Sequence, residues 1–585
     1  MSRSFNRPLA LLVGTLVLCS VCGGLTVGSW WLVRQVTDQS SSRQDNPTRP
    51  RRPTAASDTR SAGTPLGSAG AGSSSAPAGS AADAAAPVRG GTLRLPGGKP
   101  TTLDPAKVRD LVSADYMYEI YSGLVTLSPT LEVVPDLAER WDVSADGRIY
   151  TFTLRTGLSF QDGRPLSAHD VAYGIERTCD PATASLVGKS YLGDIVGCAE
   201  KLAGQAKVVR GLDVVDNRHI AITIDQPKSY FLAKLTYPTA FVLDQIQVES
   251  DAHWADHPNS TGPFRLTTYD PETKIVLERW EKYYRGPAYL DKVEYDLRPV
   301  DPTTRYENGE LDATPVSAMD EERVRDPLNP LSHEIVDGPG GLDITYLAMN
   351  MRVPPFDDVH VRRALNWVID KEKLATIVLR GAIKPANGIL PPGMPGYHKD
   401  IAPYRFDPAK ARAELAASRY GGPAGIGAFT LNASGADPVV QAVADMISGT
   451  LGITVNIEVA EWDQFQQDIE ADRYSAYILG WSADYPDPQD FLDVLFHSRS
   501  GLNHLGYSNP QVDTLLEQAR VVQDEAERFR LYGEAERQIL DDAPWVPIYH
   551  GADLWLVAPY VQGFTVPAIV LPRMAKVWLL PAEEH

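Results

Sequence analysis

The order of hydrophobic and polar residues along the body of the chain predicts short strands and helices in close succession. Residues 149–154 alternate between large apolar side chains and threonines, which indicates a half-buried strand. Asp146-Gly147, just before it, has the composition of a two-residue hairpin turn. Upstream we expect a short amphipathic turn at 136–141 and a strand at 141–143. Ser167 then caps a helix whose apolar side chains recur with helical spacing.

The second half of the chain alternates strands with helices. The predicted elements are strands at 429–433, 453–459 and 474–481 and helices at 437–451 and 524–540. A strand, a helix and a strand in succession are typical of a doubly wound α/β lobe. Two further strands, at 546–549 and 554–557, are expected to return to the lobe in which the chain began.

The N-terminal apolar run differs from everything that follows it. Residues 8–33 contain no charge over about 26 positions, enough for a helix to span a bilayer. We expect an uncleaved membrane anchor over residues 1–34, and the alternatives are a cleaved signal peptide or a lipoprotein signal ending at Cys19 or Cys22. Residues 35–88 are mainly Ser, Ala, Gly, Pro and Thr and are expected to form a disordered linker, because they cannot bury enough surface to offset ordering entropy.

Length and charge narrow the class of protein. The 585 residues are enough for two or three lobes. A formal net charge of −20 argues against a cationic surface for nucleic acid, so no such partner is expected. The 11 Trp and 25 Tyr suit a pocket that holds organic ligands by stacking and hydrogen bonding.

Three stretches of the body carry motifs. Residues 135–171 contain, in order, P-x-L-A-E-x-W, D-G-x-x-Y-T-F-x-L-R and F-x-D-G-x-P-L-x-A-x-D-V. Residues 346–370 contain P-P-F-x-D and a helix ending in I-D, and residues 480–488 read G-W-x-x-D-x-x-D-P. In these motifs and their order the chain resembles the extracellular solute-binding proteins of family 5, the peptide-binding receptors of ABC importers.

The resemblance implies an α/β fold of two lobes, the periplasmic-binding-protein or Venus-flytrap fold, with a large discontinuous first lobe. We expect lobe one at residues 89–340, lobe two at 341–542 and a C-terminal return to lobe one at 543–585. Two crossing connections would form the hinge, and a bound ligand would close the cleft.

The resemblance also implies a function. A monomeric binding component, extracellular or periplasmic and anchored by its N-terminus, would capture peptides and deliver them to an ABC permease. The same fold binding another solute, such as an oligosaccharide, an opine or a metal chelate, is an open alternative, as is a surface sensor. The arginines after the apolar run, taken alone, favour a cytoplasmic body, but the resemblance outweighs them.

Three residues are predicted to line the ligand site. Asp484 follows the strand at 474–481, and in an open α/β sheet ligands lie beyond the carboxyl ends of strands. In peptide receptors of the family the Asp of W-x-x-D pairs with the ligand's α-ammonium group, which assigns that role to Asp484, with Trp481 and Trp462 walling the site. The alternatives are a structural ion pair for Asp484 and a packed interdomain position for Trp462.

One departure from the family bears on the ligand. Dipeptide receptors place an Arg in the loop after the strand that matches residues 429–433, and that Arg clamps the ligand carboxylate. Here residues 432–437 contain no cation. An oligopeptide, or a ligand without a fixed C-terminus, is therefore favoured over a strict dipeptide.

The residue patterns give little support for an enzyme or for a metal-binding protein. The chain has neither a G-x-S-x-G elbow nor an H-E-x-x-H motif, so an enzyme, such as a surface hydrolase, is disfavoured. His253 and His257 have the spacing of two ligands on one helix face, but Pro258 favours a solvated loop, and neither metal nor cofactor is expected. Arg362 and Arg363 resemble an anion site, although a packed or solvated helix face is preferred.

Two cysteines of the body lie 19 positions apart, at Cys179 and Cys198. Because the body is expected outside the cytoplasm, where disulfides persist, we predict that they are bonded. Two buried free thiols are the alternative.

Overall fold

The structure is a computed structural model, and it describes residues 86–401, 404–551, 553–569 and 573–581. The predicted anchor at residues 1–34 and the predicted linker up to residue 85 lie outside these ranges. Within them, no helix is both long and apolar enough to cross a bilayer.

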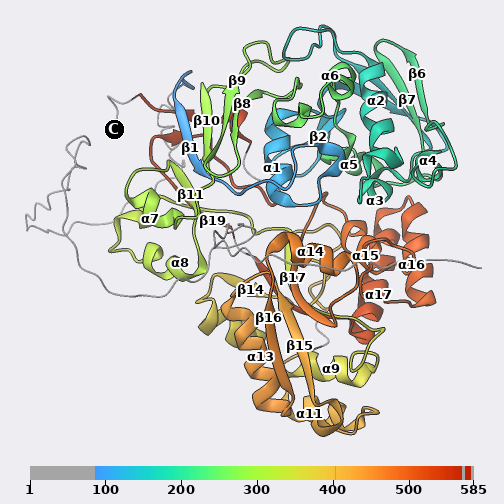
Figure 1. The fold of residues 1–585 in the computed structure, drawn as a ribbon, viewed down its shortest axis with the longest axis vertical. Coiled ribbons are helices and arrows are strands. Elements are labelled where there is room, and N and C mark those ends of the chain that lie inside the picture. The colour runs from blue at the N-terminus through green and yellow to red at the C-terminus, as the bar shows by residue number, and fades with distance from the viewer. Residues whose placement is uncertain (1–85, 402–403, 552, 570–572, 582–585) are drawn as a thin grey trace, which may run out of the picture. The chain divides into compact units, whose positions relative to one another are not determined.

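The first lobe is built from small sheets (Figure 1). Its strands are β1 (Thr92–Pro96), β2 (Val125–Leu127), β3 (Val133–Pro135), β4 (Ala138–Val143), β5 (Ile149–Leu154), β6 (Leu212–Asp216), β7 (His219–Thr223), β8 (Phe264–Asp270), β9 (Lys274–Arg279), β10 (Lys292–Asp296), β11 (Ala313–Pro315), β12 (Ile335–Asp337), β19 (Leu554–Val557), β20 (Val561–Gln562) and β21 (Trp578–Leu579). The larger sheets have the orders β1-β10-β9-β8, β4-β5-β7-β6 and β11-β19-β12, and two-stranded sheets pair β2 with β3 and β20 with β21.

Short helices connect these strands. They are α1 (Leu111–Ile120), α2 (Ala168–Thr178), α3 (Gly188–Leu192), α4 (Cys198–Leu202), α5 (Phe231–Lys234), α6 (Gln245–Ser250), α7 (Pro302–Glu307) and α8 (Ala318–Arg325). The predicted cap of α2 is confirmed, because the backbone N–H of Ser167 donates to the Asp170 carboxylate at 2.8 Å. The sheets and helices share one apolar core.

The motif-bearing hairpin forms as predicted at its turn and second strand. β5 spans the predicted residues, and Gly147 in the turn has a φ of 69°, the left-handed region that glycine tolerates. The predicted amphipathic turn at 136–141 is wrong, because β4 begins at Ala138 and pairs with β5 from there. Ala138 is buried and neighbours Leu154, so packing against β5 favours the extended conformation.

The second lobe has one six-stranded sheet. Its strands are β13 (Asp343–Met349), β14 (Ile383–Pro385), β15 (Ala428–Ala433), β16 (Thr454–Val459), β17 (Ala476–Ser482) and β18 (Trp545–Gly551), in the order β14-β18-β13-β17-β15-β16. β15 runs parallel to β16 and β17, whereas β13 is antiparallel to β17 and β18. The predicted β-α-β unit at 429–459 is therefore present within a mixed sheet.

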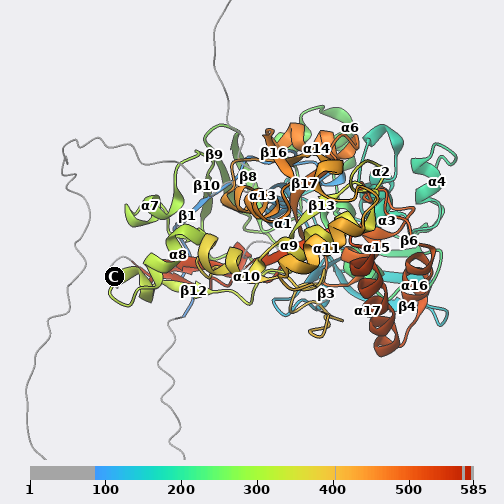
Figure 2. The ribbon, with the colours of Figure 1, turned by 90° about the horizontal axis from the view of Figure 1, so that it is seen from below.

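Helices cover both faces of this sheet (Figure 2). They are α9 (Val359–Val368), α10 (Lys371–Lys373), α11 (Pro408–Ala417), α12 (Pro423–Ile426), α13 (Pro438–Leu451), α14 (Trp462–Glu470), α15 (Gln489–Phe496), α16 (Pro510–Val521) and α17 (Glu525–Asp542). In β13, Leu347 and Met349 pack with α9, α11 and α13, whereas Tyr346 and Ala348 face the cluster of α14 to α17. Two-sided burial explains why residues 346–349 of β13 are continuously apolar.

The C-terminal segment is shared between the two lobes, and the chain passes from one to the other at a later residue than expected. β18 was expected in lobe one but pairs with β13 and β14, while β19 pairs with β11 and β12 in lobe one. Trp545 in β18 stacks on Tyr346 with ring centroids 3.4 Å apart, which buries β18 in the lobe-two core. The chain therefore returns to lobe one after Gly551 and not at residue 543.

Two connections cross between the lobes, one from β12 to β13 and one from β18 to β19. The Asp343 carboxylate accepts the backbone N–H of Gly551 at 2.7 Å, and the N–H of Gly338 donates to the carbonyl of Asp553 at 2.7 Å. Hydrogen bonds thus tie the two connections together, so a rotation of one lobe against the other bends both.

The disulfide between Cys179 and Cys198 is present. Cys179 ends α2 and Cys198 begins α4, and their Cα atoms are 5.2 Å apart. Both side chains are fully buried in the lobe-one core. The bond therefore closes the loop that carries α3.

Replacing both Cys179 and Cys198 by Ser should lower the free energy of unfolding by about 3 kcal/mol, the chain-entropy value for a closed loop of this length. Urea unfolding without reductant measures the change. Dithiothreitol should shift the wild type toward the double variant and leave the variant unchanged. Equal unfolding midpoints for the two proteins would contradict the prediction.

Candidate functional site

The parallel strands of lobe two deliver their loops to one edge of the sheet. β15, β16 and β17 run in the same direction, so the segments that follow Ala433, Val459 and Ser482 leave the same edge. α14 and α15, which follow two of these segments, lie on the side of lobe two that faces lobe one (Figure 1). The predicted site residues Trp462 and Asp484 belong to these segments.

Asp484 lies just beyond β17, next to Trp481. Its backbone N–H donates to Oδ2 of Asp490 at 2.9 Å. Within the described ranges its carboxylate has no hydrogen-bond donor and no cation. Burial raises the pKa of Asp484 well above its usual range, and the charge of Asp490 raises it further. The structural ion pair that was the alternative for Asp484 is thus not formed.

Four aspartates recur at intervals of three through this segment: Asp484, Asp487, Asp490 and Asp493. Asp487 accepts two hydrogen bonds from Arg528 of α17, at 2.8 and 2.9 Å. Asp493 accepts two from Arg520 of α16, both at 2.6 Å. The Asp487 carboxylate also accepts the backbone N–H of Gln489, the first residue of α15, at 3.0 Å.

Tyr485, between these acids, reaches into the other lobe. It is fully buried and meets the ring of Tyr191 edge-on, with centroids 6.2 Å apart. Tyr191 in turn stacks on Tyr237 at 4.3 Å. Because Tyr485 belongs by sequence to lobe two and by packing to the lobe-one core, it joins the two lobes beside Asp484.

A buried lysine of lobe one faces the acidic segment. Lys234 in α5 donates to the carbonyl of Ser190 at 2.8 Å and to Asp194 at 2.9 Å. Its charge lowers the pKa values of Asp487 and Asp490 without forming an ion pair with either in the described structure. Lys234 is already neutralised by Asp194 and therefore offsets little of the acidic charge.

Trp462 is the first residue of α14 and is partly buried against Phe465, with ring centroids 6.3 Å apart. The other end of α14 contacts lobe one, because Glu470 forms an ion pair with Arg109. Trp462 thus lies on a helix at the lobe boundary, whereas Trp481 and Asp484 are grouped with Asp490.

A cavity of about 110 Å³ lies where the two connections cross. Lobe one contributes Leu111 and Trp555 to its wall, and lobe two contributes Asp343 and Ser482. Burial and the charge of Asp343 raise the pKa of Asp553, also in the wall, to about 6. The space adjoins the segment that carries Asp484 and is enclosed by both lobes.

The predicted loop and helix features take structural roles. Asp437, in the loop without a cation, caps α13 by accepting the N–H of Val439 at 2.7 Å. Arg362 donates to the carbonyls of Phe356 and Asp542 at 2.7–3.0 Å. Arg363 pairs with Asp541, so the packed helix face is the correct interpretation.

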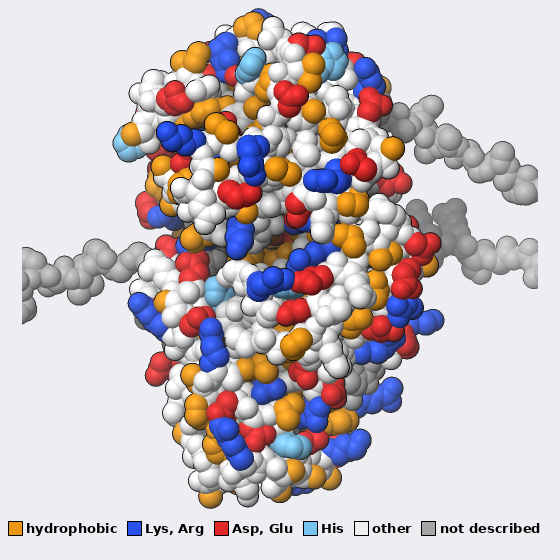
Figure 3. All heavy atoms as spheres, turned by 90° about the vertical axis from the view of Figure 1, so that its right-hand side faces the viewer, with side chains coloured by type: hydrophobic (Ala, Val, Ile, Leu, Met, Phe, Trp, Pro, Cys, Tyr) orange, Lys and Arg blue, Asp and Glu red, His pale blue; other side chains and the backbone are white. Residues whose placement is uncertain are grey.

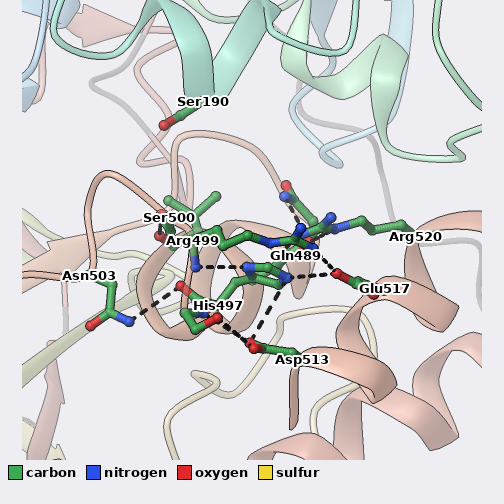
Figure 4. Close-up of polar contacts among 12 residues, drawn as sticks. Ser190, Gln489, His497, Arg499, Ser500, Asn503, Asp513, Glu517 and Arg520 are labelled. Carbon is green, nitrogen blue, oxygen red and sulfur yellow. Dashed lines mark hydrogen bonds and ion pairs between the residues drawn. The ribbon is translucent and has the colours of Figure 1, made fainter. Parts of the chain in front are cut away.

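The histidines make structural contacts as well. His253 and His257 are exposed and lie near Asp256 and Asp251. Figure 4 shows His497 at the end of α15, where Nδ1 accepts the N–H of Arg499 and Nε2 lies 3.3 Å from Glu517. The part of the chain that the structure describes contains no group of three or more His, Cys, Asp and Glu residues placed to hold a metal ion.

Charge is distributed evenly over the visible surface. Figure 3 shows Lys and Arg side chains interspersed with Asp and Glu over both lobes on one face. No single-sign patch dominates that face.

Sequence reasoning missed Asp490, Tyr485 and Arg109. The recurrence of aspartate at intervals of three, from Asp484 to Asp493, was the sequence signal that could have pointed to Asp490. Tyr485 and Arg109 gave no such signal, since their partners lie far away in the sequence.

Known proteins resemble this chain in sequence. It is 32% identical over 481 residues to the probable deoxycholate-binding periplasmic protein YgiS of Escherichia coli, covering 80% of this chain and 89% of YgiS. It is 29% identical over 486 residues to the periplasmic oligopeptide-binding protein OppA of Salmonella typhimurium, covering 80% of this chain and 88% of OppA.

The fold is also known. The structure of the murein tripeptide binding protein MppA of Escherichia coli, 26% identical, superposes with a TM-score of 0.77 over 85% of this chain and 99% of MppA. The unliganded open form of MppA gives a TM-score of 0.65.

The family follows from a match over most of the body. Residues 132–503 match the bacterial extracellular solute-binding proteins, family 5, in the middle region that defines the family. With the two-lobed fold, this match shows that the chain belongs to the family 5 bacterial extracellular solute-binding proteins.

Proposed function

We propose that this chain is the binding component of an ABC importer and captures peptides by their free amino terminus. Asp484 is the observation that carries the proposal. A partly buried carboxylate at a lobe boundary, with no cation among the described residues, is stabilised when a ligand supplies one. A relative named for oligopeptide binding and a structural neighbour named for a murein tripeptide support peptides as the ligand class.

The charge at the site argues against an anionic ligand. The relative YgiS is named for probable binding of deoxycholate, a carboxylate. An anion close to Asp484 and Asp490 would meet repulsion in a medium where charges are weakly screened. The loop at 432–437 has no cation to fix a ligand carboxylate, so oligopeptides fit this site better than strict dipeptides.

The mechanism we propose is closure of the lobes over the ligand, bending the two connections near Gly338 and Gly551. Trp481 and Trp462 would wall the site in the closed state, and Arg109–Glu470 would join the lobe surfaces. The chain binds and releases its ligand without chemistry, as family membership supports.

Delivery requires a permease and a location outside the cytoplasm. We propose that the body acts as a monomer, extracellular or periplasmic, and that residues 1–34 anchor it to the membrane. The support for the anchor is the uncharged run at 8–33.

Asp484→Asn should weaken binding of a free-amine peptide such as trialanine by about a hundredfold, because a charge-assisted bond worth about 1.5–3 kcal/mol is lost. N-acetyl-trialanine should bind the wild type poorly and lose little more in the variant. Titration calorimetry measures both peptides. Asp445→Asn, an exposed position on α13, is the control and should bind like the wild type. Equal affinity of Asp484→Asn and wild type for trialanine would overturn the assignment.

Glu470→Gln should release bound trialanine up to about fivefold faster, since partly exposed ion pairs contribute about 0.2–1 kcal/mol. Stopped-flow dissociation measures the rate. The difference should vanish at high salt, where the pair is screened. Glu458→Gln, exposed on β16, is the matched control, and an equal effect there would show that net charge and not the ion pair is responsible.

The first 34 residues should remain on the mature protein. Intact-mass analysis of protein extracted from membranes measures this directly. A mass beginning at Cys19 or Cys22 with attached lipid would replace the anchor with a lipoprotein. A soluble form beginning near residue 35 would indicate cleavage.

A further inference from the structure

The four aspartates from Asp484 to Asp493 differ in their partners. Asp487 and Asp493 each have an arginine within 2.9 Å. In the described structure Asp484 and Asp490 form no ion pair. The acids that have an arginine partner therefore alternate along the segment with those that have none.

Asp490 is the more deeply placed of the two. It is fully buried, and its Oδ2 accepts the backbone N–H of Asp484 at 2.9 Å. Its Oδ1 has no hydrogen-bond partner in the described part of the molecule. The indole N–H of Trp481 lies near enough to lower the pKa of Asp490 but is not in hydrogen-bonding geometry. The donors near Asp490 are uncharged, so within the described residues this buried carboxylate lacks a cationic partner.

The groups around the pair do not supply that partner. Lys234 is the cation that acts on Asp490, and it is bound to Asp194 and to the Ser190 carbonyl. The remaining neighbours that act electrostatically with the pair are Tyr118, Tyr237, Tyr485 and Asp487. The tyrosines are buried with raised pKa values and are neutral, and Asp487 is acidic.

Two buried carboxylates without a cation cannot both carry charge at little cost. Burial raises the pKa of Asp490 to about 8, and burial together with the charge of Asp490 raises the pKa of Asp484 well above its usual range. The protons of such a pair belong to both groups together. The empty site therefore holds at least one proton at neutral pH.

We propose that Asp490 is a second acidic residue of the ligand site and that a cationic ligand displaces a proton held by Asp484 and Asp490. This inference rests on the proposed function. In the exchange the protonated pair and an ammonium ion combine, and one proton passes to solvent. No covalent bond between heavy atoms forms or breaks. A neutral ligand lacks the charge to drive the exchange, so the pair selects for cations.

The exchange fixes how affinity depends on pH. Because binding releases a proton, the association constant should rise with pH, by up to tenfold per unit while the pair remains protonated. The rise should end near pH 8, where the pair has lost its proton and the α-amino group of a peptide begins to lose its own.

Calorimetry of the full chain with trialanine tests this. Titrations between pH 5.5 and 8 in buffers of different ionisation enthalpy give the number of protons released. The wild type should release close to one proton at pH 7 and bind up to about a hundredfold more tightly at pH 7.5 than at 5.5. Binding without proton release and with constant affinity would overturn the inference.

Asp490→Asn separates this role from a structural one. Asparagine keeps an oxygen to accept the N–H of Asp484 but cannot titrate. The variant should still bind trialanine, release far fewer protons at pH 7 and show a nearly flat affinity from pH 6 to 8. Asp445→Asn should follow the wild type. Proton release from Asp490→Asn equal to that of the wild type would overturn the inference.

A measurement on the empty protein distinguishes this inference from the proposed function. Infrared difference spectra of wild type and Asp490→Asn report the C=O band of a protonated carboxyl group as pH is raised. A band that persists at pH 7 in the wild type and is lost in the variant supports the shared proton, even if trialanine does not bind and the proposed function fails. Trialanine binding through Asp484 with no such band sinks the inference and leaves the proposed function intact.

Discussion

Desolvation of acidic groups at the lobe boundary is the constraint on which the site depends. A carboxylate moved away from water needs a cation or a proton, and each of the four aspartates after β17 meets that need differently. Asp487 and Asp493 use arginines of α17 and α16, which fix those helices against α15. Asp484 and Asp490 have no such partner in the described structure, and we propose that a ligand supplies it. The acids with structural partners and the proposed ligand-binding acids are thus neighbours in one short segment.

Local patterning accounts for much of the fold. β5, the cap of α2 and the unit from β15 to β16 were predictable because their alternation, capping and turn residues act within a few positions. β18 was predicted to belong to the wrong lobe, because an apolar strand has the same residue pattern in either lobe. Its true position depends on stacking with Tyr346, about 200 positions away in the sequence. β4 began early for a similar reason, since its pairing with β5 overrode the local signal.

The site was predictable to a smaller extent. The position of Asp484 at the end of a strand and its place in a motif located the region. Whether Asp484 had a partner could not be read from sequence, because any of 55 Lys and Arg residues was available to it. Tyr485 shows the same limit, since it follows Asp484 directly yet packs with Tyr191 of the other lobe. Contacts between distant segments decide which members of a motif remain open to a ligand.

The position of β19 in its sheet affects the order in which the two lobes can fold during synthesis. β19 is the middle strand of β11-β19-β12, so those two strands have no direct partner in each other until residues 554–557 exist. The sheet of lobe two is complete once β18 exists, although Ile569 later adds to the core of that lobe, so this sheet can form earlier during synthesis. A nascent chain that ends before residue 554 would thus carry the complete sheet of lobe two beside an incomplete lobe one. In such a chain the edges of β11 and β12 would be unpaired and accessible to cellular quality control, whereas in the complete chain β19 covers them.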